Sequence, residues 1–188
     1  MKLSFEGHAK GGVERVAVEI GELVIAPSYA GDQYRSEPPS RLTQGDEIQA
    51  CEQASGAAVP VLVGAADRLW VTAGSDHGDG KVVARVAWRF EEVEPHWNRL
   101  ILHGFVHDGS KRVPYQEGPL GQLTAPRDLI LGWRGAKRLA VGVAMFCGTM
   151  PALGPVQPGE RFEIELEDPV LGRRLVHSYH VQSLPVVA

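Results

Sequence analysis

Glycine and proline recur so often along this chain that few segments between them can form an extended helix. The 188 residues include 22 glycines and 13 prolines, a share well above the average for globular proteins. Glycine interrupts regular structure because its backbone is permissive, and proline because it lacks an N–H donor. Such spacing favours short strands joined by tight turns. The sequence therefore predicts a chain that turns often and has few, short helices.

Alternating apolar residues indicate the strands most clearly near the C-terminus. In residues 160–167, Phe162, Ile164 and Leu166 alternate with glutamates, which is the period of a strand with one buried face. A short turn follows, and residues 174–181 are again rich in β-forming residues. The two segments together predict a hairpin at the end of the chain.

The same kind of pattern extends through the rest of the sequence. Asp108-Gly109 lies between two β-rich runs, which is a strong signal for a second hairpin. The expected strands are residues 13–20, 23–26, 48–51, 59–63, 69–73, 82–90, 99–107, 111–116 and 139–146. We therefore expect most of the chain to form β-sheet.

Helical signals are few. Residues 91–98 predict a short helical turn with acidic residues near its start. Residues 120–131 are the best helix candidate, with Pro126 in a first turn and Gly132 after the end. The predicted fold class is mostly β, a β-rich mixed α+β fold with few short helices.

No linker or internal repeat divides the sequence, so we expect a single domain over residues 1–188. Residues 1–40 are expected to form irregular N-terminal strands and a loop, because Gly31, Pro38 and Pro39 interrupt a stretch with few apolar residues. Residues 42–188 are expected to form the core.

Charge and hydropathy exclude several kinds of partner. With 19 Lys and Arg against 23 Asp and Glu, the net charge of −4 offers no basic surface for nucleic acid. The longest nearly apolar stretch, residues 139–150, is shorter than the ~20 residues that a membrane span needs. The polar residues 1–8 precede no signal-peptide core, so a cytoplasmic location is expected. Cys51 and Cys147 lie too far apart to indicate a zinc pair or a disulfide framework.

Polar side chains are densest in residues 74–81, at the exit of an expected strand. Asp76 and Asp79 are carboxylates of the kind that bind hard cations, and His77 can act as a base or a further ligand. Lys81 can pair with a substrate carboxylate or enolate. The alternative is a polar turn whose aspartates bond to their own backbone, with Lys81 in solvent.

Two other positions are candidates for binding or catalysis. Gly148 and Thr149 end an expected strand, where a hydroxyl and a backbone N–H can face a substrate oxygen, although a simple turn has the same pattern. Glu117 ends a hairpin strand and can complete a metal shell or act as a general base. An exposed strand end is the alternative for Glu117.

Other conspicuous residues favour structural roles. The glutamates of residues 163–167 share one strand face and are expected in solvent, where they would discourage edge-to-edge pairing. His103 and His107 share a face with Phe105, which is typical of a half-buried surface rather than of a ligand pair. Cys147 lies in an apolar run, where a thiol normally packs as a small hydrophobic group.

Several sequence blocks resemble the fumarylacetoacetate hydrolase (FAH) superfamily. Residues 145–154 (MFCGTMPALG) and 156–166 (VQPGERFEIEL) resemble its C-terminal signature, in which a strand ends in a Gly-Thr motif, followed by a Pro-Gly turn and an acidic strand. Further blocks resemble an uncharacterised bacterial family of FAH-like proteins: residues 42–49, 74–77, 87–90 and 115–118.

The resemblance implies an FAH-like fold, a homodimer, and an active site that binds Mg²⁺ or Mn²⁺. The family's reactions include hydrolysis of C–C bonds in β-diketones and decarboxylation of 2-oxo acids, in which the metal stabilises an enolate. The implied roles are metal ligation by Asp76, Asp79 and Glu117, proton transfer by His77, and binding of a substrate oxygen by Thr149.

One departure from the family pattern keeps a second hypothesis open. The family's Glu-x-Glu metal pair is missing from its expected place, and such spacing occurs only at Glu92/Glu94 and in residues 163–167. The first hypothesis is a metal-assisted hydrolase or lyase for a small 2-oxo or β-dicarbonyl acid. The alternative is a catalytically silent FAH-like domain for dimerisation or small-ligand binding. A third possibility is that a partner subunit completes the sheet of a shortened chain.

Overall fold

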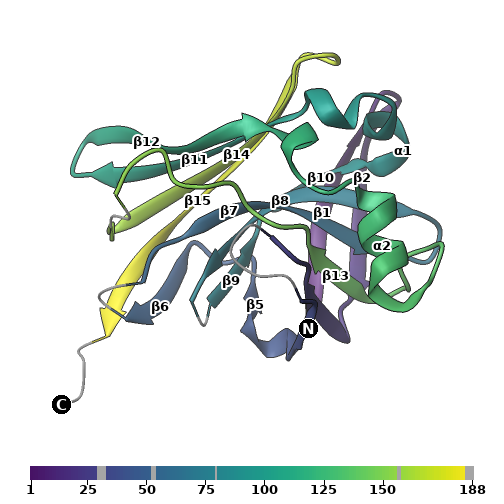
Figure 1. Ribbon diagram of the computed structural model, residues 1–188, viewed down its shortest axis with the longest axis horizontal. Coiled ribbons are helices and arrows are strands. Elements are labelled where there is room, and N and C mark those ends of the chain that lie inside the picture. The colour runs from purple at the N-terminus through teal and green to yellow at the C-terminus, as the bar shows by residue number, and fades with distance from the viewer. Residues whose placement is uncertain (29–32, 52–53, 79, 156–157, 185–188) are drawn as a thin grey trace.

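Two β-sheets form most of the protein (Figure 1). The structure is a computed structural model and describes residues 1–28, 33–51, 54–78, 80–155 and 158–184. Within these residues the first sheet has ten strands and the second has five. The predicted mostly β fold with short helices is confirmed.

The larger sheet has the order β2-β1-β10-β8-β7-β13-β3-β4, and β9 joins β5 to β8. Its strands are β1 (Lys2–Ala9), β2 (Gly12–Glu19), β3 (Glu22–Ile25), β4 (Arg35–Glu37), β5 (Leu42–Thr43), β7 (Ala57–Gly64), β8 (Leu69–His77), β9 (Gly80–Val83), β10 (Val86–Arg89) and β13 (Val143–Phe146). Most neighbouring strands are antiparallel, but β1 pairs with β10 in parallel, as do β3 with β13 and β5 with β9.

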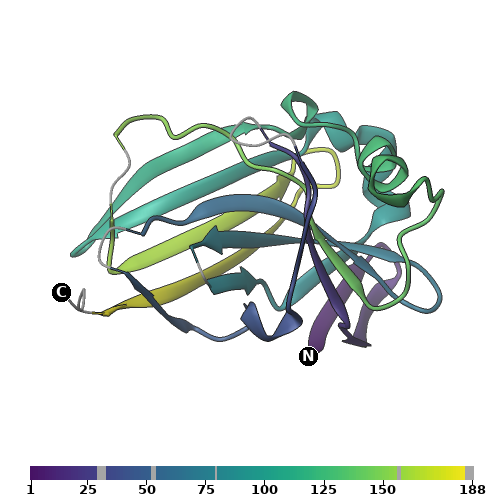
Figure 2. The same cartoon turned by 60° about the horizontal axis from the view of Figure 1, so that its bottom comes forward.

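The smaller sheet has the order β12-β11-β14-β15-β6. Its strands are β6 (Glu47–Cys51), β11 (Ile101–Asp108), β12 (Lys111–Pro119), β14 (Arg161–Asp168) and β15 (Arg173–Leu184). Both predicted hairpins, β11–β12 and β14–β15, are confirmed. The turned view in Figure 2 shows these strands side by side, with the helices gathered at one end of the molecule.

Two large apolar cores explain this arrangement, and a third, smaller cluster includes Phe162 and Tyr179. One core lies between the sheets, where Leu62 and Val71 of the larger sheet pack with Leu102 and Ile164 of the smaller one. The other core consists almost entirely of side chains from the larger sheet, Phe5 among them. Strand β7 contributes to both cores, so the larger sheet curls around its own core and is covered on its other face by the smaller sheet.

The helices are short, and most of them begin at or beside a proline. They are α1 (Phe90–Val93), α2 (Pro126–Arg134) and the 3₁₀ turns η1 (Pro39–Arg41), η2 (Glu94–Arg99) and η3 (Leu120–Gln122). The helix predicted over residues 120–131 is divided, because residues 120–122 form η3 and α2 begins at Pro126. Helix α2 ends at Arg134 and not before Gly132, because Gly135, with φ 67°, forms the left-handed cap. No helix among the described residues is long and apolar enough to span a membrane.

Several strand boundaries differ from the sequence prediction. The local pattern does not identify β1, whose alternate residues Leu3 and Phe5 are buried. Strand β8 continues past Gly74 to His77, and the expected strand 82–90 is divided into β9 and β10. Gly74 lies inside β8 and is not a strand end. A Cβ atom there would collide with Val61 and the Val82 carbonyl, so the glycine permits close packing.

Gly64, the last residue of β7, provides a test of the close packing beside the central strands. A Cβ atom at this position would overlap the backbone carbonyl of Ala140, which cannot move as a flexible side chain does. We expect Gly64→Ala to lower the free energy of unfolding by about 1–3 kcal/mol, measured by denaturant titration. Gly11→Ala is the matched control, because nothing lies within 4 Å of its Cβ position. Equal stability of the two variants would contradict this packing.

Candidate functional site

The predicted polar cluster of residues 74–81 forms the β8–β9 hairpin. In its register Asp76 pairs with Lys81, and His77 pairs with Gly80. Successive residues of a strand point to opposite faces, so Asp76 and Lys81 share one face while His77 lies on the other. Asp79 lies outside the described residues. The hairpin therefore separates the predicted metal ligand Asp76 from the predicted base His77.

Lys81 is buried rather than in solvent, with 2% of its side chain exposed. Its Nζ atom lies 2.8 Å from Asp76 Oδ1 and 3.5 Å from Glu37 Oε2. The ammonium group also donates a hydrogen bond of 2.5 Å to the Gly78 carbonyl oxygen. Three protein oxygens thus surround the charge, and Lys81 holds the carboxylate that we assigned to a metal.

His77 is fully buried and belongs to a polar chain between the two sheets. Its Nδ1 atom lies 3.0 Å from the Tyr179 hydroxyl, which lies 2.7 Å from Ser75 Oγ. The edge of Phe162 packs against the imidazole, with ring centroids 4.9 Å apart. Burial lowers the pKa of His77 to about 4, so the ring is neutral at pH 7.

Gly148 and Thr149 form the turn after β13, as the sequence predicts, and Gly148 has the positive φ of 94° that favours glycine. The Thr149 hydroxyl donates to the Ala58 carbonyl at 2.7 Å and accepts from Gln116 Nε2 at 2.8 Å. Gln116 also accepts a bond from Ala58 N and donates to the Met150 carbonyl. Gln116 thus ties β12 of the smaller sheet to β7 and the β13 turn.

A cleft of about 310 Å³ lies beside this turn. Its polar lining residues are Ser28, Gln122, Thr124 and Thr149, and apolar residues such as Met150 complete it. Cys147 also lines the cleft, but burial raises the pKa of its thiol to about 12, which rules out a ready thiolate. We call this space the Thr149 cleft. None of the predicted site residues that the structure describes lines a larger cleft of about 680 Å³ elsewhere.

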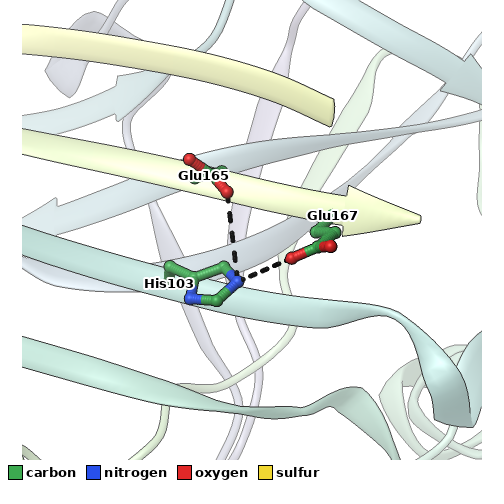
Figure 3. A group of neighbouring side chains, drawn as sticks. All are labelled: His103, Glu165 and Glu167. Carbon is green, nitrogen blue, oxygen red and sulfur yellow. Dashed lines mark hydrogen bonds and ion pairs between the residues drawn. The ribbon is translucent and has the colours of Figure 1, made fainter. Parts of the chain in front are cut away.

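Glu117 lies on the outer face of the smaller sheet, next to Gln116 in β12 but on the opposite side of the strand. Its Oε2 atom is 3.3 Å from His103 Nδ1. On the other edge of the imidazole, Nε2 lies 3.1 Å from Glu167 and 4.0 Å from Glu165 (Figure 3). The predicted ligands Glu117 and Asp76 therefore belong to different clusters on different sheets.

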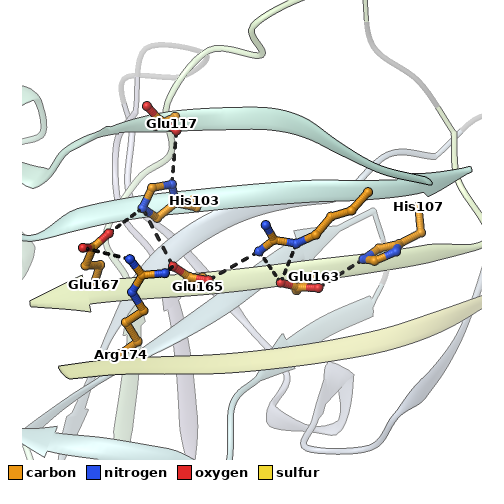
Figure 4. Close-up of polar contacts among 8 residues, drawn as sticks. His103, His107, Glu117, Glu163, Glu165, Glu167 and Arg174 are labelled. Atoms are coloured by element: carbon orange, nitrogen blue, oxygen red, sulfur yellow. Dashed lines mark hydrogen bonds and ion pairs between the residues drawn. The ribbon is translucent and has the colours of Figure 1, made fainter. Parts of the chain in front are cut away.

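The outer face carries a network of alternating charges (Figure 4). Arg174 lies 3.2 Å from both Glu165 and Glu167. Farther along the strand, Glu163 accepts hydrogen bonds from Arg112 and pairs with His107 at 3.1 Å. The network, which we call the outer ion-pair network, consists of His103, His107, Arg112, Glu117, Glu163, Glu165, Glu167 and Arg174.

The prediction that these glutamates lie in solvent is wrong for Glu163 and Glu165, which are only 9% and 5% exposed. Arginine and histidine side chains from neighbouring strands cover them. Burial alone would raise the pKa of Glu163, but hydrogen bonds from Arg112 and His107 outweigh burial and lower it.

Donor atoms of His103, Glu165 and Glu167 lie within 4.8 Å of one another, a spacing that a metal ion can bridge. The same two carboxylates already contact Arg174, and Glu165 also lies 3.4 Å from Arg112. Because the guanidinium groups supply positive charge here, the cluster is balanced as an ion-pair network.

Comparison with known proteins supports the fold directly. Residues 5–179 match a family model described as "Protein of unknown function (DUF2848)". A search of curated proteins finds no match.

Solved structures with the same fold include enzymes. An FAH-family protein from Yersinia pestis CO92 has a TM-score of 0.68 and 12% identity, covering 95% of this chain and 100% of its own. Maleylpyruvate hydrolase from Sphingobium sp. SYK-6, in complex with manganese(II) and pyruvate, has a TM-score of 0.62 and 13% identity, covering 91% of this chain and 77% of that chain.

A third such structure is 5-carboxymethyl-2-hydroxymuconate delta-isomerase from Mycobacterium smegmatis, with a TM-score of 0.64 and 13% identity. The alignment covers 94% of this chain and 83% of the isomerase chain. The shared fold extends over nearly the whole chain, and the family match spans most of it. The chain therefore belongs to the DUF2848 family and has an FAH-like fold.

Proposed function

We propose that this protein binds a small 2-oxo or β-dicarbonyl acid in the Thr149 cleft and acts on it as a hydrolase or lyase. The observation that carries the proposal is the position of the cleft, beside the Gly148–Thr149 turn to which the resemblance assigns a substrate oxygen. A hydrolase with the same fold was solved in complex with manganese(II) and pyruvate, a small 2-oxo acid.

The lining of the cleft suits a small acid. A volume of about 310 Å³ is at the lower end of the range for ligand pockets. The Gln122 amide and the Thr124 hydroxyl can donate hydrogen bonds to a carboxylate. Because the Thr149 hydroxyl already donates to Ala58, its remaining capacity is to accept a bond, for example from an enol hydroxyl.

The predicted metal centre does not fit the residues of the β8–β9 hairpin as they stand. Asp76 is paired with Lys81, and its cross-strand neighbour on β7 is Ala57, whose methyl group offers no ligand. Glu117 contacts His103 on the other sheet. The proposal therefore contains no step through Mg²⁺ or Mn²⁺, and relies on the hydrogen bonds of the cleft.

A second candidate function is the catalytically silent FAH-like domain, a small-ligand binding or dimerisation module. The observation that favours it is the lining of the Thr149 cleft: among its described residues, the high pKa of Cys147 leaves no side chain ready to transfer a proton at pH 7. This candidate shares ligand binding with the first and lacks turnover. The homodimer implied by the resemblance is part of both candidates, and light scattering measures it.

Ligand binding can be tested by thermal unfolding of metal-stripped protein with oxalate and with pyruvate. A ligand at a hundredfold excess over Kd stabilises the folded state by about 2.7 kcal/mol, which raises Tm by several degrees in a chain of this size. We expect Thr124→Val to weaken oxalate binding about tenfold, because it removes a donor to a charged group and little volume. Ser110→Ala, in the turn between β11 and β12, is the control.

The outcomes separate the two candidates. Binding with turnover in a screen of 2-oxo and β-dicarbonyl acids supports the enzyme, and binding without turnover supports the silent module. If neither acid changes Tm in the wild-type protein, both candidates that place a small acid in this cleft are wrong.

The burial of a neutral imidazole at His77 is tested by the pH dependence of stability, and its predicted proton-transfer role by turnover. The folded-state pKa of about 4 lies below the ordinary value of 6.5, so the unfolded chain binds the proton more readily. Stability is therefore retained above pH 6.5 and is lost as the pH falls towards 4, by up to roughly 3 kcal/mol. Denaturant titrations at several pH values should show this slope flattened in His77→Gln.

His8→Gln, at an exposed end of β1, is the control and should keep the slope. A smaller slope should remain in His77→Gln, because burial also lowers the pKa of His177. An unchanged slope in His77→Gln would show that the buried imidazole is not the group that titrates. Turnover that survives His77→Gln would assign His77 to the structure rather than to proton transfer.

A further inference from the structure

The oxygens around Lys81 come from three separate parts of the chain. Asp76 lies opposite Lys81 on β8, the Gly78 carbonyl belongs to the hairpin turn, and Glu37 ends β4, a strand far from β9 in the order of the larger sheet. Their distances from Nζ are 2.8, 2.5 and 3.5 Å. The ammonium group therefore makes one hydrogen bond, to the Gly78 carbonyl, and two ion pairs.

The oxygens around Lys81 are of the kind that would also bind a metal cation. Two carboxylates and a backbone carbonyl are the ligands that hard divalent cations take from proteins. A buried charge is stable only when it is paired and hydrogen-bonded, and Lys81 meets this condition with ion pairs to Asp76 and Glu37 and a hydrogen bond to the Gly78 carbonyl. A metal ion and the ammonium group cannot both occupy the centre of this set.

The charged residues around Asp76 and Glu37 are also consistent with Lys81 as the cation of this site. Glu37 also lies 3.7 Å from Arg35 and 3.8 Å from Arg41, so its carboxylate has further positive charge nearby. On the other side of Asp76, Ala57 supplies no additional negative charge. While Lys81 is present, Asp76 and Glu37 are both paired with cations, so a divalent ion would find no unpaired carboxylate among these residues.

We propose that the Lys81 ammonium takes the place of a divalent cation in the β8–β9 hairpin, so that this site holds no metal in the native protein. Its removal opens a site for Mn²⁺ formed by Asp76, Glu37 and the Gly78 carbonyl. The proposal concerns the hairpin only and does not depend on a ligand in the Thr149 cleft.

The test measures binding of Mn²⁺ alone by the electron paramagnetic resonance signal of the free ion. Lys81→Met keeps an unbranched apolar chain and removes the charge. We expect this variant to bind Mn²⁺ at least tenfold more tightly than the wild type and to gain Tm when Mn²⁺ is added. The gain should disappear in Lys81→Met/Asp76→Asn. Lys111→Met, at an exposed lysine that begins β12, is the matched control and should behave like the wild type.

Two results would overturn the proposal. One is folded Lys81→Met protein that binds Mn²⁺ no better than Lys111→Met. The other is wild-type protein whose Mn²⁺ binding is lost in Asp76→Asn, because the metal would then share or displace the ammonium group.

A measurement on the wild type keeps the test valid if Lys81→Met does not fold. Acetic anhydride modifies free lysine amines, so we expect Lys81 to be acetylated at least tenfold more slowly than Lys111, both with and without Mn²⁺. Faster acetylation of Lys81 in the presence of Mn²⁺ would show that the metal displaces the ammonium group, which contradicts the proposal. Neither readout uses oxalate or turnover, so failure here is distinct from failure of the proposed function.

Discussion

The central strands β7 and β8 are covered on both faces, so a polar group that they carry is stabilised only by partners inside the protein. This constraint accounts for the polar contacts at the centre of the fold. The Thr72 hydroxyl donates to the Val86 carbonyl, Ser75 and His77 contact the Tyr179 hydroxyl, and Asp76 is paired with Lys81. A polar residue on these strands is thus fixed by the packing before any ligand is present.

Because of the same constraint, the Thr149 cleft lies at the edge of the buried region. Gln116 and Thr149 bind each other and Ala58, which joins the two sheets and holds the β13 turn in place. The cleft beside this turn is lined by Gln122 and Thr124, which are exposed and can contact a ligand. Residues that resemble the family motif therefore support the cleft, and in the proposed function side chains outside the motif contact the ligand.

Local patterns predict the strands and the two hairpins because alternation is a property of neighbouring residues. They do not predict what covers a strand face, which depends on pairing between distant segments. Glu163 and Glu165 share the face expected from their spacing, but Arg112 of β12 and Arg174 of β15 bury them. The burial of Lys81 was not predictable for the same reason, because its partner Glu37 lies on β4 and no local signal links the two residues.

The two clusters of cations and carboxylates have the same chemistry in different surroundings. Arg174 and Arg112 are 59% and 43% exposed, so solvent and salt screen the outer ion-pair network, and each pair contributes little to stability. Lys81 is buried, and loss of one partner there leaves an uncompensated charge at a cost of several kcal/mol. The exposed guanidinium groups of the outer face are thus more replaceable than the buried ammonium group of the hairpin. This difference makes the hairpin, and not the more conspicuous outer cluster, the place where a lysine substitutes for a metal.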